Sequence, residues 1–239
     1  MSISGLSDWL QTPLGQYVLQ WEQTQYDAAV VDIFGFNAVQ IGWRECDLLR
    51  ANRMPLRLRC DAGGRDGRIA VNSAFEHLPF ATASIDLVIL PHILEFSTSP
   101  HQVLREVERV LVPEGQVVIT GFNPFSLWGV RRKFLASSRF PWSGRYLSVM
   151  RLKDWLTLLN FETREGSFGC YRPPVEPEKW LRNWQWMELA GNRWWPIAGS
   201  VYMIQAVKRV HGMRLITPAW RDQQKPAPGL APATQRTKR

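Results

Sequence analysis

The spacing of apolar and polar positions divides the first part of the chain into one long helix and three short strands. Apolar residues recur at three- and four-residue steps over residues 6–35, which predicts a helix that Gly35 is placed to end. Short apolar or alternating runs then predict strands at 37–42, 56–60 and 68–72. A glycine-containing turn separates the last two strands.

The middle of the chain has the clearest pattern. Residues 85–90 (IDLVIL) form a nearly continuous aliphatic run, which is typical of a strand buried on both faces of a parallel sheet. Pro100 opens an amphipathic helix over 100–111. The turn at 113–115 ends it, and 116–121 (QVVITG) predicts the next strand. Strand, helix and strand in this order predict a βαβ unit with a right-handed crossover.

The last third of the chain continues the alternation of helices and strands. Its pattern predicts helices at 152–159 and 178–190 and strands at 161–168 and 201–207. Such an alternation favours a three-layer α/β domain over a helical bundle or an all-β fold.

Composition suggests three parts. We expect a helical extension over 1–36, an α/β domain over 37–210 and a basic, largely disordered tail over 211–239, where too little apolar surface offsets the ordering entropy. The formal net charge is +8. Part of the excess lies in a second group of cations: Arg131, Arg132, Lys133, Arg139, Arg145, Arg151 and Lys153. This group is interpreted as a solvated face, a site for an anionic substrate, or a surface for nucleic acid or the anionic membrane.

Several classes of protein do not match the sequence. The N-terminus lacks the pattern of a secretory signal, and the longest apolar stretch, 28–43, is too short and too polar to span a bilayer. Cys46, Cys60 and Cys170 are odd in number and include no Cys-x-x-Cys pair, so we expect neither a disulfide framework nor a metal site. These features predict a cytoplasmic protein.

Residues 73–121 carry a series of motifs in a fixed order. They are LPF at 78–80, ASIDLV at 83–88, LPH at 90–92, VLREVERVL at 103–111 and PEG at 113–115. In this order they resemble the type 11 group of class I S-adenosylmethionine-dependent methyltransferases, and the resemblance covers most of residues 37–208. It implies a Rossmann-like three-layer sandwich with S-adenosylmethionine in the crevice outside the carboxyl ends of the strands. Residues 90–96 and 121–132 resemble an uncharacterised bacterial branch of the group, which implies no substrate.

The resemblance implies two cofactor-binding residues in the first half of the domain. Gly42 takes the place of the family's first glycine, although Trp43, Arg44 and Glu45 replace the further glycines. Gly35 is a rival for this place. Asp61 takes the place of the acid that binds the ribose hydroxyls. The alternative for Asp61 is a turn aspartate beside two glycines.

The resemblance implies three further cofactor contacts. Ala74 falls at the family's adenine-side acid and cannot form a side-chain hydrogen bond, so Ser73 is the substitute. Leu90 ends the strand that leads into the crevice.

The interval 43–67 is short, because two ordinary crossovers with a strand between them need roughly 29 residues. We therefore expect at least one crossover helix to be shortened or missing.

His92 is the candidate catalytic residue. At the end of strand 85–90, a neutral imidazole is placed to accept a proton from the acceptor. The alternative is that His92 packs against, or caps, the turn before helix 100–111. Glu95 has the same two interpretations.

Tryptophans are concentrated near the C-terminal end of the domain. Five lie close together: Trp180, Trp184, Trp186, Trp194 and Trp195. They are interpreted as rings covering a sheet edge, as a lid over an apolar acceptor, or as an interfacial membrane contact.

The sequence thus predicts a methyltransferase that uses S-adenosylmethionine and a small acceptor of anionic or apolar character. The alternative is a catalytically silent relative that keeps the fold as a binding or regulatory module.

Overall fold

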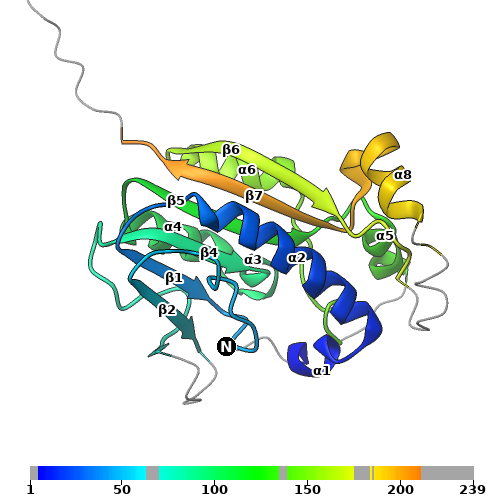
Figure 1. Cartoon of the computed structure of the whole chain (residues 1–239), viewed down its shortest axis with the longest axis horizontal. Coiled ribbons are helices and arrows are strands. Elements are labelled where there is room, and N and C mark those ends of the chain that lie inside the picture. Colours follow the sequence, from blue (N-terminus) through cyan, green and yellow to red (C-terminus); the bar gives the residue numbers. More distant parts are fainter. Residues whose placement is uncertain (1–4, 63–69, 135–138, 175–183, 185, 211–239) are drawn as a thin grey trace, which may run out of the picture.

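The computed structural model describes residues 5–62, 70–134, 139–174, 184 and 186–210. A seven-stranded sheet in the order β3-β2-β1-β4-β5-β7-β6 runs through the molecule (Figure 1). Its strands are β1 (Asn37–Ile41), β2 (Leu56–Asp61), β3 (Val71–Asn72), β4 (Ile85–Pro91), β5 (Leu111–Phe122), β6 (Phe161–Gly169) and β7 (Val201–Lys208). The first five strands pair in parallel, and β7 is antiparallel to β5 and β6.

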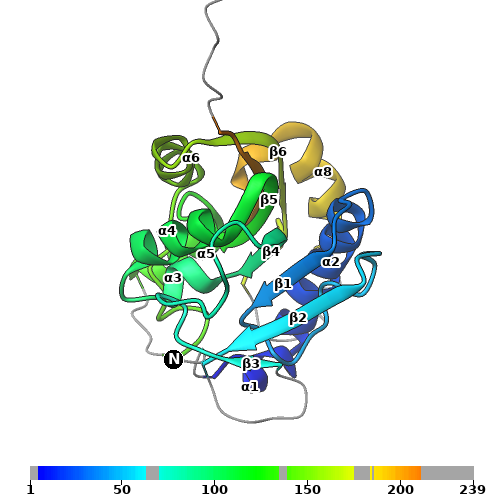
Figure 2. The same ribbon diagram turned by 90° about the vertical axis from the view of Figure 1, so that its left-hand side faces the viewer.

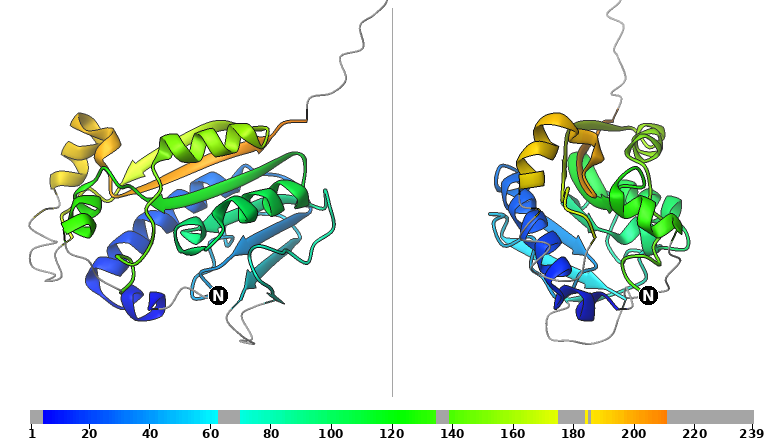
Figure 3. Two further views of the ribbon diagram at one scale, coloured as in Figure 1. Left: turned by 180° about the vertical axis from the view of Figure 1, so that it is seen from behind. Right: turned by 90° about the vertical axis from the view of Figure 1, so that its right-hand side faces the viewer.

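Helices cover both faces of this sheet. They are α1 (Leu6–Leu10), α2 (Pro13–Val31), α3 (Ile93–Phe96), α4 (Pro100–Val110), α5 (Leu127–Phe134), α6 (Val149–Leu158) and α8 (Trp186–Trp194), with the short 3-10 helix η1 (Pro196–Ala198). Figures 2 and 3 show α2 on one face and α4 and α6 on the other. The expected three-layer α/β sandwich is thereby confirmed. No helix of the described part is long and apolar enough to cross a membrane.

Burial on both faces explains the continuous apolar run of β4. Leu87 and Ile89 belong to the core beneath α2, whereas Val88 and Leu90 belong to the core beneath α4 and α6. Because side chains alternate across a strand, each face receives every second residue. The aliphatic pattern therefore predicted the central position of this strand correctly.

The expected single helix over 6–35 was wrong in two respects. The chain breaks between α1 and α2, where the Thr12 side chain accepts a hydrogen bond from the Gly15 N–H and Pro13 begins α2 without an N–H of its own. Helix α2 then ends at Val31, not at Gly35. Gly35 instead lies close to Asp86, because an added Cβ would sit 2.5 Å from the Asp86 Cβ.

The crossover from β1 to β2 contains no helix, as the short interval led us to expect. Buried amide side chains hold it instead. Gln40 donates to the carbonyls of Gly42, Trp43 and Cys46, and its own oxygen accepts from the Leu48 N–H. These bonds satisfy backbone groups that a helix would otherwise pair.

Helix α2 covers the face that a crossover helix would have occupied. Its buried stripe repeats every four residues: Leu14, Val18, Glu22, Tyr26 and Val30. Asn52, in the β1–β2 crossover, donates to the carbonyls of Val30 and Ile33 and so ties the crossover to the end of α2. The described part of the expected extension, residues 5–36, thus packs directly on the sheet.

Other expected boundaries need smaller corrections. Strand β5 begins at Leu111 instead of 116, because residues 112–115 form a bulge opposite the stretch from Ile85 to Leu87 and the strand continues. Helix α6 begins at Val149, where Ser148 caps it. Helix α8 ends at Trp194, beyond the expected 190, and most of the earlier part of that prediction lies outside the described residues. The tail 211–239 also lies outside them.

Candidate functional site

Gly42 directly follows β1, at the carboxyl edge of the sheet. Its φ of 77° is left-handed, a conformation that glycine adopts without strain. An added Cβ would lie 2.3 Å from Cδ1 of Ile93, so the position also lacks room for a side chain. Its N–H donates to the carbonyl of Cys60 in β2. The register with Gly42 after the first strand is therefore the one that the structure adopts, and Gly35 precedes β1.

A cavity of about 230 Å³ opens beside Gly42. Residues from four parts of the chain line it, among them Asp8, Gly42, Trp43, Glu45, Asp61 and Phe75. Gly42 and Asp61 stand at the carboxyl ends of neighbouring parallel strands, as the sequence predicted. This is where open α/β sheets hold their ligands.

Carboxylates dominate the charge of this cavity. Asp8, Glu45 and Asp61 line it, and Arg44 is the cation among the lining residues. The Asp61 carboxylate accepts a hydrogen bond of 2.7 Å from the Ala62 N–H, and burial raises the pKa of Asp61 above its ordinary value. An acidic cavity in a chain of net charge +8 favours a ligand that carries a cation or hydroxyl donors.

Two buried polar atoms beside the cavity have no protein partner. They are Oε2 of Glu45 and the indole Nε1 of Trp43. The other carboxylate oxygen of Glu45 accepts from the Ser7 hydroxyl at 2.5 Å. Since buried donors and acceptors are normally paired, these atoms mark positions where a bound molecule would gain hydrogen bonds.

The β4 side of the same edge is closed by a buried ionic cluster. His92 follows β4, its Nδ1 lies 2.8 Å from Oε2 of Glu95, and its Nε2 lies 2.8 Å from Oε1 of Glu22. Glu22 comes from α2, and all three side chains are buried. We call this group the His92 cluster.

The His92 imidazole is protonated in this cluster. Burial by itself lowers the pKa of His92, but the carboxylates of Glu22 and Glu95 outweigh it and raise that pKa to about 9. Both ring nitrogens donate to carboxylates, so no lone pair is free. The geometry therefore contradicts the expectation of a neutral catalytic base and corresponds to the alternative in which His92 packs.

Trp43 separates the cavity from the His92 cluster. Its ring stacks on the imidazolium with centroids 5.3 Å apart and an interplanar angle of 19°, while the same residue lines the cavity. An aromatic face next to a buried cation is a favourable arrangement. Trp43 is thus a wall shared by the open and the closed parts of the edge.

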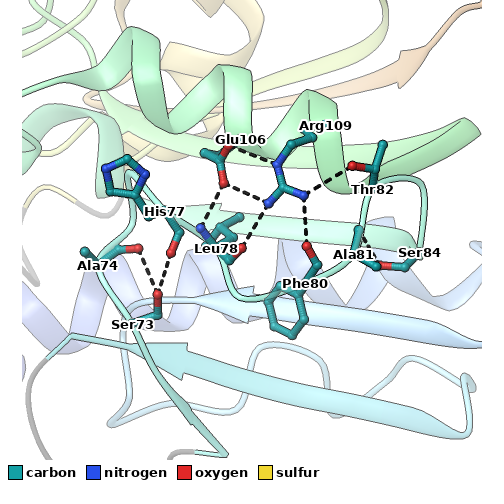
Figure 4. Close-up of polar contacts among 10 residues, drawn as sticks. All are labelled: Ser73, Ala74, His77, Leu78, Phe80, Ala81, Thr82, Ser84, Glu106 and Arg109. Carbon is teal, nitrogen blue, oxygen red and sulfur yellow. Dashed lines mark hydrogen bonds and ion pairs between the residues drawn. The ribbon is translucent and has the colours of Figure 1, made fainter.

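The remaining expected cofactor contacts do not line the cavity. The Ser73 hydroxyl donates to the carbonyls of His77 and Ala74, within their own turn, and the side chain of Ala74 is exposed (Figure 4). Leu90 is completely buried beneath α4. The cofactor roles expected for these three residues have no counterpart in the cavity.

The Glu106-x-x-Arg109 motif on α4 stabilises the turn before β4 (Figure 4). Arg109 donates to the carbonyls of Leu78 and Phe80 and pairs with Glu106 at 2.9 Å. Glu106 in turn accepts from the Leu78 N–H, and Arg109 lowers its pKa. The Glu-x-x-Arg pair thereby holds the turn that carries the chain into β4.

Sequence reasoning missed several residues of the site. Phe75 and the carboxylate of Glu45 line the cavity, and Glu22 completes the His92 cluster. Glu22 had a signal in the sequence, because it interrupts the apolar stripe of α2 between Val18 and Tyr26. A charge on a buried face is unusual unless it is paired.

Part of the chain is similar to a known protein family. The family model described as a methyltransferase domain matches residues 53–119, which run from before β2 almost to the end of β5. Over these residues the chain is similar to the methyltransferase-domain family. The sheet order and the reversed β7 give the chain the class I S-adenosylmethionine-dependent methyltransferase fold.

Solved methyltransferases share this fold. A chain of the complex between the Haloferax volcanii Trm112 methyltransferase activator and a methyltransferase superposes with a TM-score of 0.59 at 15% identity, covering 83% of this chain and 93% of that one. A methyltransferase from Archaeoglobus fulgidus gives a TM-score of 0.56 at 18% identity, covering 79% and 94%.

Curated relatives match parts of the chain. The uncharacterised protein YafS of Escherichia coli is 33% identical over 161 residues, which are 66% of each protein. A malonyl-[acyl-carrier protein] O-methyltransferase of Methylovorus is 31% identical over 98 residues, 41% of this chain and 33% of that enzyme. The matches thus span just under two thirds and one third of the relatives' lengths.

Proposed function

We propose that this chain is a methyltransferase that takes its methyl group from S-adenosylmethionine and transfers it to a small molecule. The supporting observation is the acidic cavity at the carboxyl ends of β1 and β2, which is lined by Gly42 and Asp61, the two residues for which the resemblance implies cofactor contacts. The bound cofactor would supply an electrophilic methyl group on a sulfonium centre.

The lining residues match the chemistry of that cofactor. The Asp61 carboxylate would accept hydrogen bonds from the ribose hydroxyls, and the Phe75 ring offers an apolar surface for the adenine. Asp8 and Glu45 provide negative charge for the cationic groups, and the free Oε2 of Glu45 is an available acceptor. The cavity is smaller than the roughly 300–1,000 Å³ of typical ligand pockets, so we expect the cofactor to extend beyond it.

Catalysis would rest on positioning more than on proton transfer. His92 is protonated and fully hydrogen-bonded, and it has no contact with solvent. Holding an acceptor in line with an already reactive methyl group by itself gives a large rate enhancement. The acceptor is proposed only as a small molecule, because the Methylovorus enzyme shares just 98 aligned residues with this chain.

Calorimetric titration with S-adenosylhomocysteine tests this proposal, because that product needs no acceptor. We expect saturable binding to the intact protein and binding about tenfold weaker, or more, in Asp61→Asn, since one charge-assisted hydrogen bond is weakened. Asp154→Asn, at an exposed position on α6, is the matched control and should bind as the unmodified protein does. An absence of binding by folded protein would overturn the proposal in favour of a silent binding module.

A further inference from the structure

Helix α5 turns an apolar stripe toward solvent. Leu127, Val130 and Phe134 follow one another at three- and four-residue steps, and Phe134 is 78% exposed. The inward face is formed by Trp128, whose indole N–H donates to the carbonyl of Arg172. Helices of globular proteins normally bury their apolar stripe, so the outward stripe of α5 lacks a partner within the described residues.

A second exposed apolar group lies next to α5. Trp194 is 70% exposed, and Trp195 and Ile197 follow it on the surface of α8 and η1. The side-chain amide of Asn123, just before α5, donates to the carbonyls of Ile197 and Gly199 and joins the two segments. Figures 1 and 3 show α5 and α8 at the same end of the molecule.

We call these two groups, which lie at one end of the molecule and are linked through Asn123, the α5–α8 surface. It consists of Phe125, Leu127, Val130, Phe134, Trp194, Trp195 and Ile197. Large exposed apolar patches on soluble proteins mark interaction sites, because their contact with water is unfavourable.

Cations accompany the α5–α8 surface. Lys133 and Arg193 are exposed among its apolar residues, and Arg131 stacks over Trp142 at 4.9 Å. The stretches 123–134 and 193–199 contain no acidic residue. The surface is therefore apolar, aromatic and positively charged.

We propose that the α5–α8 surface docks on the interface of an anionic lipid bilayer. Tryptophan and phenylalanine favour the boundary between headgroups and acyl chains, while lysine and arginine are attracted to anionic headgroups. A nucleic acid would use the cations but leave the stripe of Leu127, Val130 and Phe134 unexplained. The contact stays at the membrane surface, and it does not depend on the methyl-transfer proposal.

Co-sedimentation of the full chain with vesicles tests this proposal. We expect the protein to sediment with phosphatidylcholine–phosphatidylglycerol vesicles, less with phosphatidylcholine alone, and less as salt is added. The double variant Phe134→Ser/Trp194→Ser should lower binding roughly tenfold or more, because two aromatic rings no longer enter the interface. The matched control is Met150→Ser/Leu158→Ser, which removes two exposed apolar residues from α6 and should bind normally.

The outcomes are decisive in both directions. No sedimentation with anionic vesicles at low salt would overturn the proposal, as would equal binding by the double variant and the control. A dimer that forms without lipid and is lost in Phe134→Ser/Trp194→Ser would assign the surface to self-association instead. Near-ultraviolet circular dichroism of both variants establishes that each is folded.

Discussion

The two halves of the carboxyl edge of the sheet differ in character. Over β1 and β2 lies a cavity lined by carboxylates, with the unpaired polar atoms of Trp43 and Glu45 beside it. Over β4 and β5 the described side chains pack against one another. The His92 cluster is completely buried there, and Phe122 packs against the rings of His92 and Tyr146 with centroids 4.1 and 5.1 Å apart.

Because of this difference, the residues of the two halves contribute to different properties of the protein, ligand binding in one and stability in the other. Unpaired polar atoms that lie at a cavity are accessible to a ligand. The closed half also holds buried oxygens without a partner, Oε2 of Glu22 and the Tyr146 hydroxyl, but neither residue lines the cavity, and the buried ions there must keep their counter-charges. Helix α2 creates the difference, because it delivers Glu22 to the β4 side, whereas α1 and the loop after β1 line the cavity on the β1–β2 side. We therefore expect substitutions in the closed half to change stability and those in the open half to change binding.

The largest effect is expected from His92→Leu. The substitution removes the cation and leaves Glu22 and Glu95 buried without a counter-charge, so the free energy of unfolding should fall by roughly 3–5 kcal/mol. Urea denaturation followed by fluorescence measures it. His77→Leu, at an exposed position, is the control and should stay within about 0.5 kcal/mol. Equal effects of the two would contradict the importance of the His92 cluster.

The pH dependence of the free energy of unfolding of the unmodified protein also tests the His92 cluster. The folded pKa of His92 is about 9 against 6.5 for an ordinary histidine, so the folded state holds one proton more between these values. This contribution is fully present below pH 6.5 and is lost as pH rises through 9. The expected loss is on the order of 3 kcal/mol.

Comparison with His92→Leu/Glu22→Gln/Glu95→Gln isolates that pH effect, because this variant lacks the imidazole and also the two buried carboxylates that would titrate without their counter-charge. Glu188, whose pKa burial raises to about 7, titrates in both proteins, so the difference between them reports the His92 cluster. Urea midpoints between pH 6 and 10 should converge as pH rises. Parallel curves would mean that the imidazole is not protonated in the folded protein.

A smaller loss is expected from Gly42→Ala. The residue has a left-handed φ, and its new Cβ would collide with Cδ1 of Ile93, so the free energy of unfolding should fall by about 1–3 kcal/mol. Gly42→Ala/Ile93→Val removes that Cδ1 and should recover part of the loss. Gly166→Ala, where the Cβ meets nothing nearer than 3.5 Å, should cost little. No recovery in the double variant would point to backbone strain alone.

The smallest effect on stability is expected from Asp61→Asn. Burial already disfavours the charged carboxylate, and the amide oxygen of asparagine still accepts from the Ala62 N–H. The free energy of unfolding from urea denaturation should therefore change by no more than about 0.5 kcal/mol, while the binding of S-adenosylhomocysteine weakens. A large loss of stability would place Asp61 in the folding core and remove it from the binding half.

Local patterns predicted most of the fold. The aliphatic run of β4, the stripe of α4 and the turn between them and β5 depend on short-range periodicity, so the βαβ unit and the sheet that contains it were correct. The short interval after Gly42 also predicted a missing crossover helix. What short-range pattern did not indicate was the break at Thr12 within an otherwise helical stretch, or the continuation of β5 through Pro113.

The candidate site was predictable only where it follows strand ends. Gly42 directly follows β1 and Asp61 is the last residue of β2, and parallel strands place such residues at one edge. The local pattern around Ser73 gave the wrong result, because its hydroxyl donates to carbonyls of its own turn and does not line the cavity. His92 stands at a strand end too, but its role depends on Glu22, which is 70 positions away in the sequence.

The sequence by itself determined the class of fold, the strands that meet at the carboxyl edge and the two residues at the mouth of the cavity, because periodicity and strand ends are local properties. Only the tertiary structure decided which half of that edge is open, how His92 is protonated and that α5 faces solvent with its apolar side. Those features depend on which distant side chains and elements meet in space, and a buried charge or an apolar stripe acquires its meaning only from its neighbours.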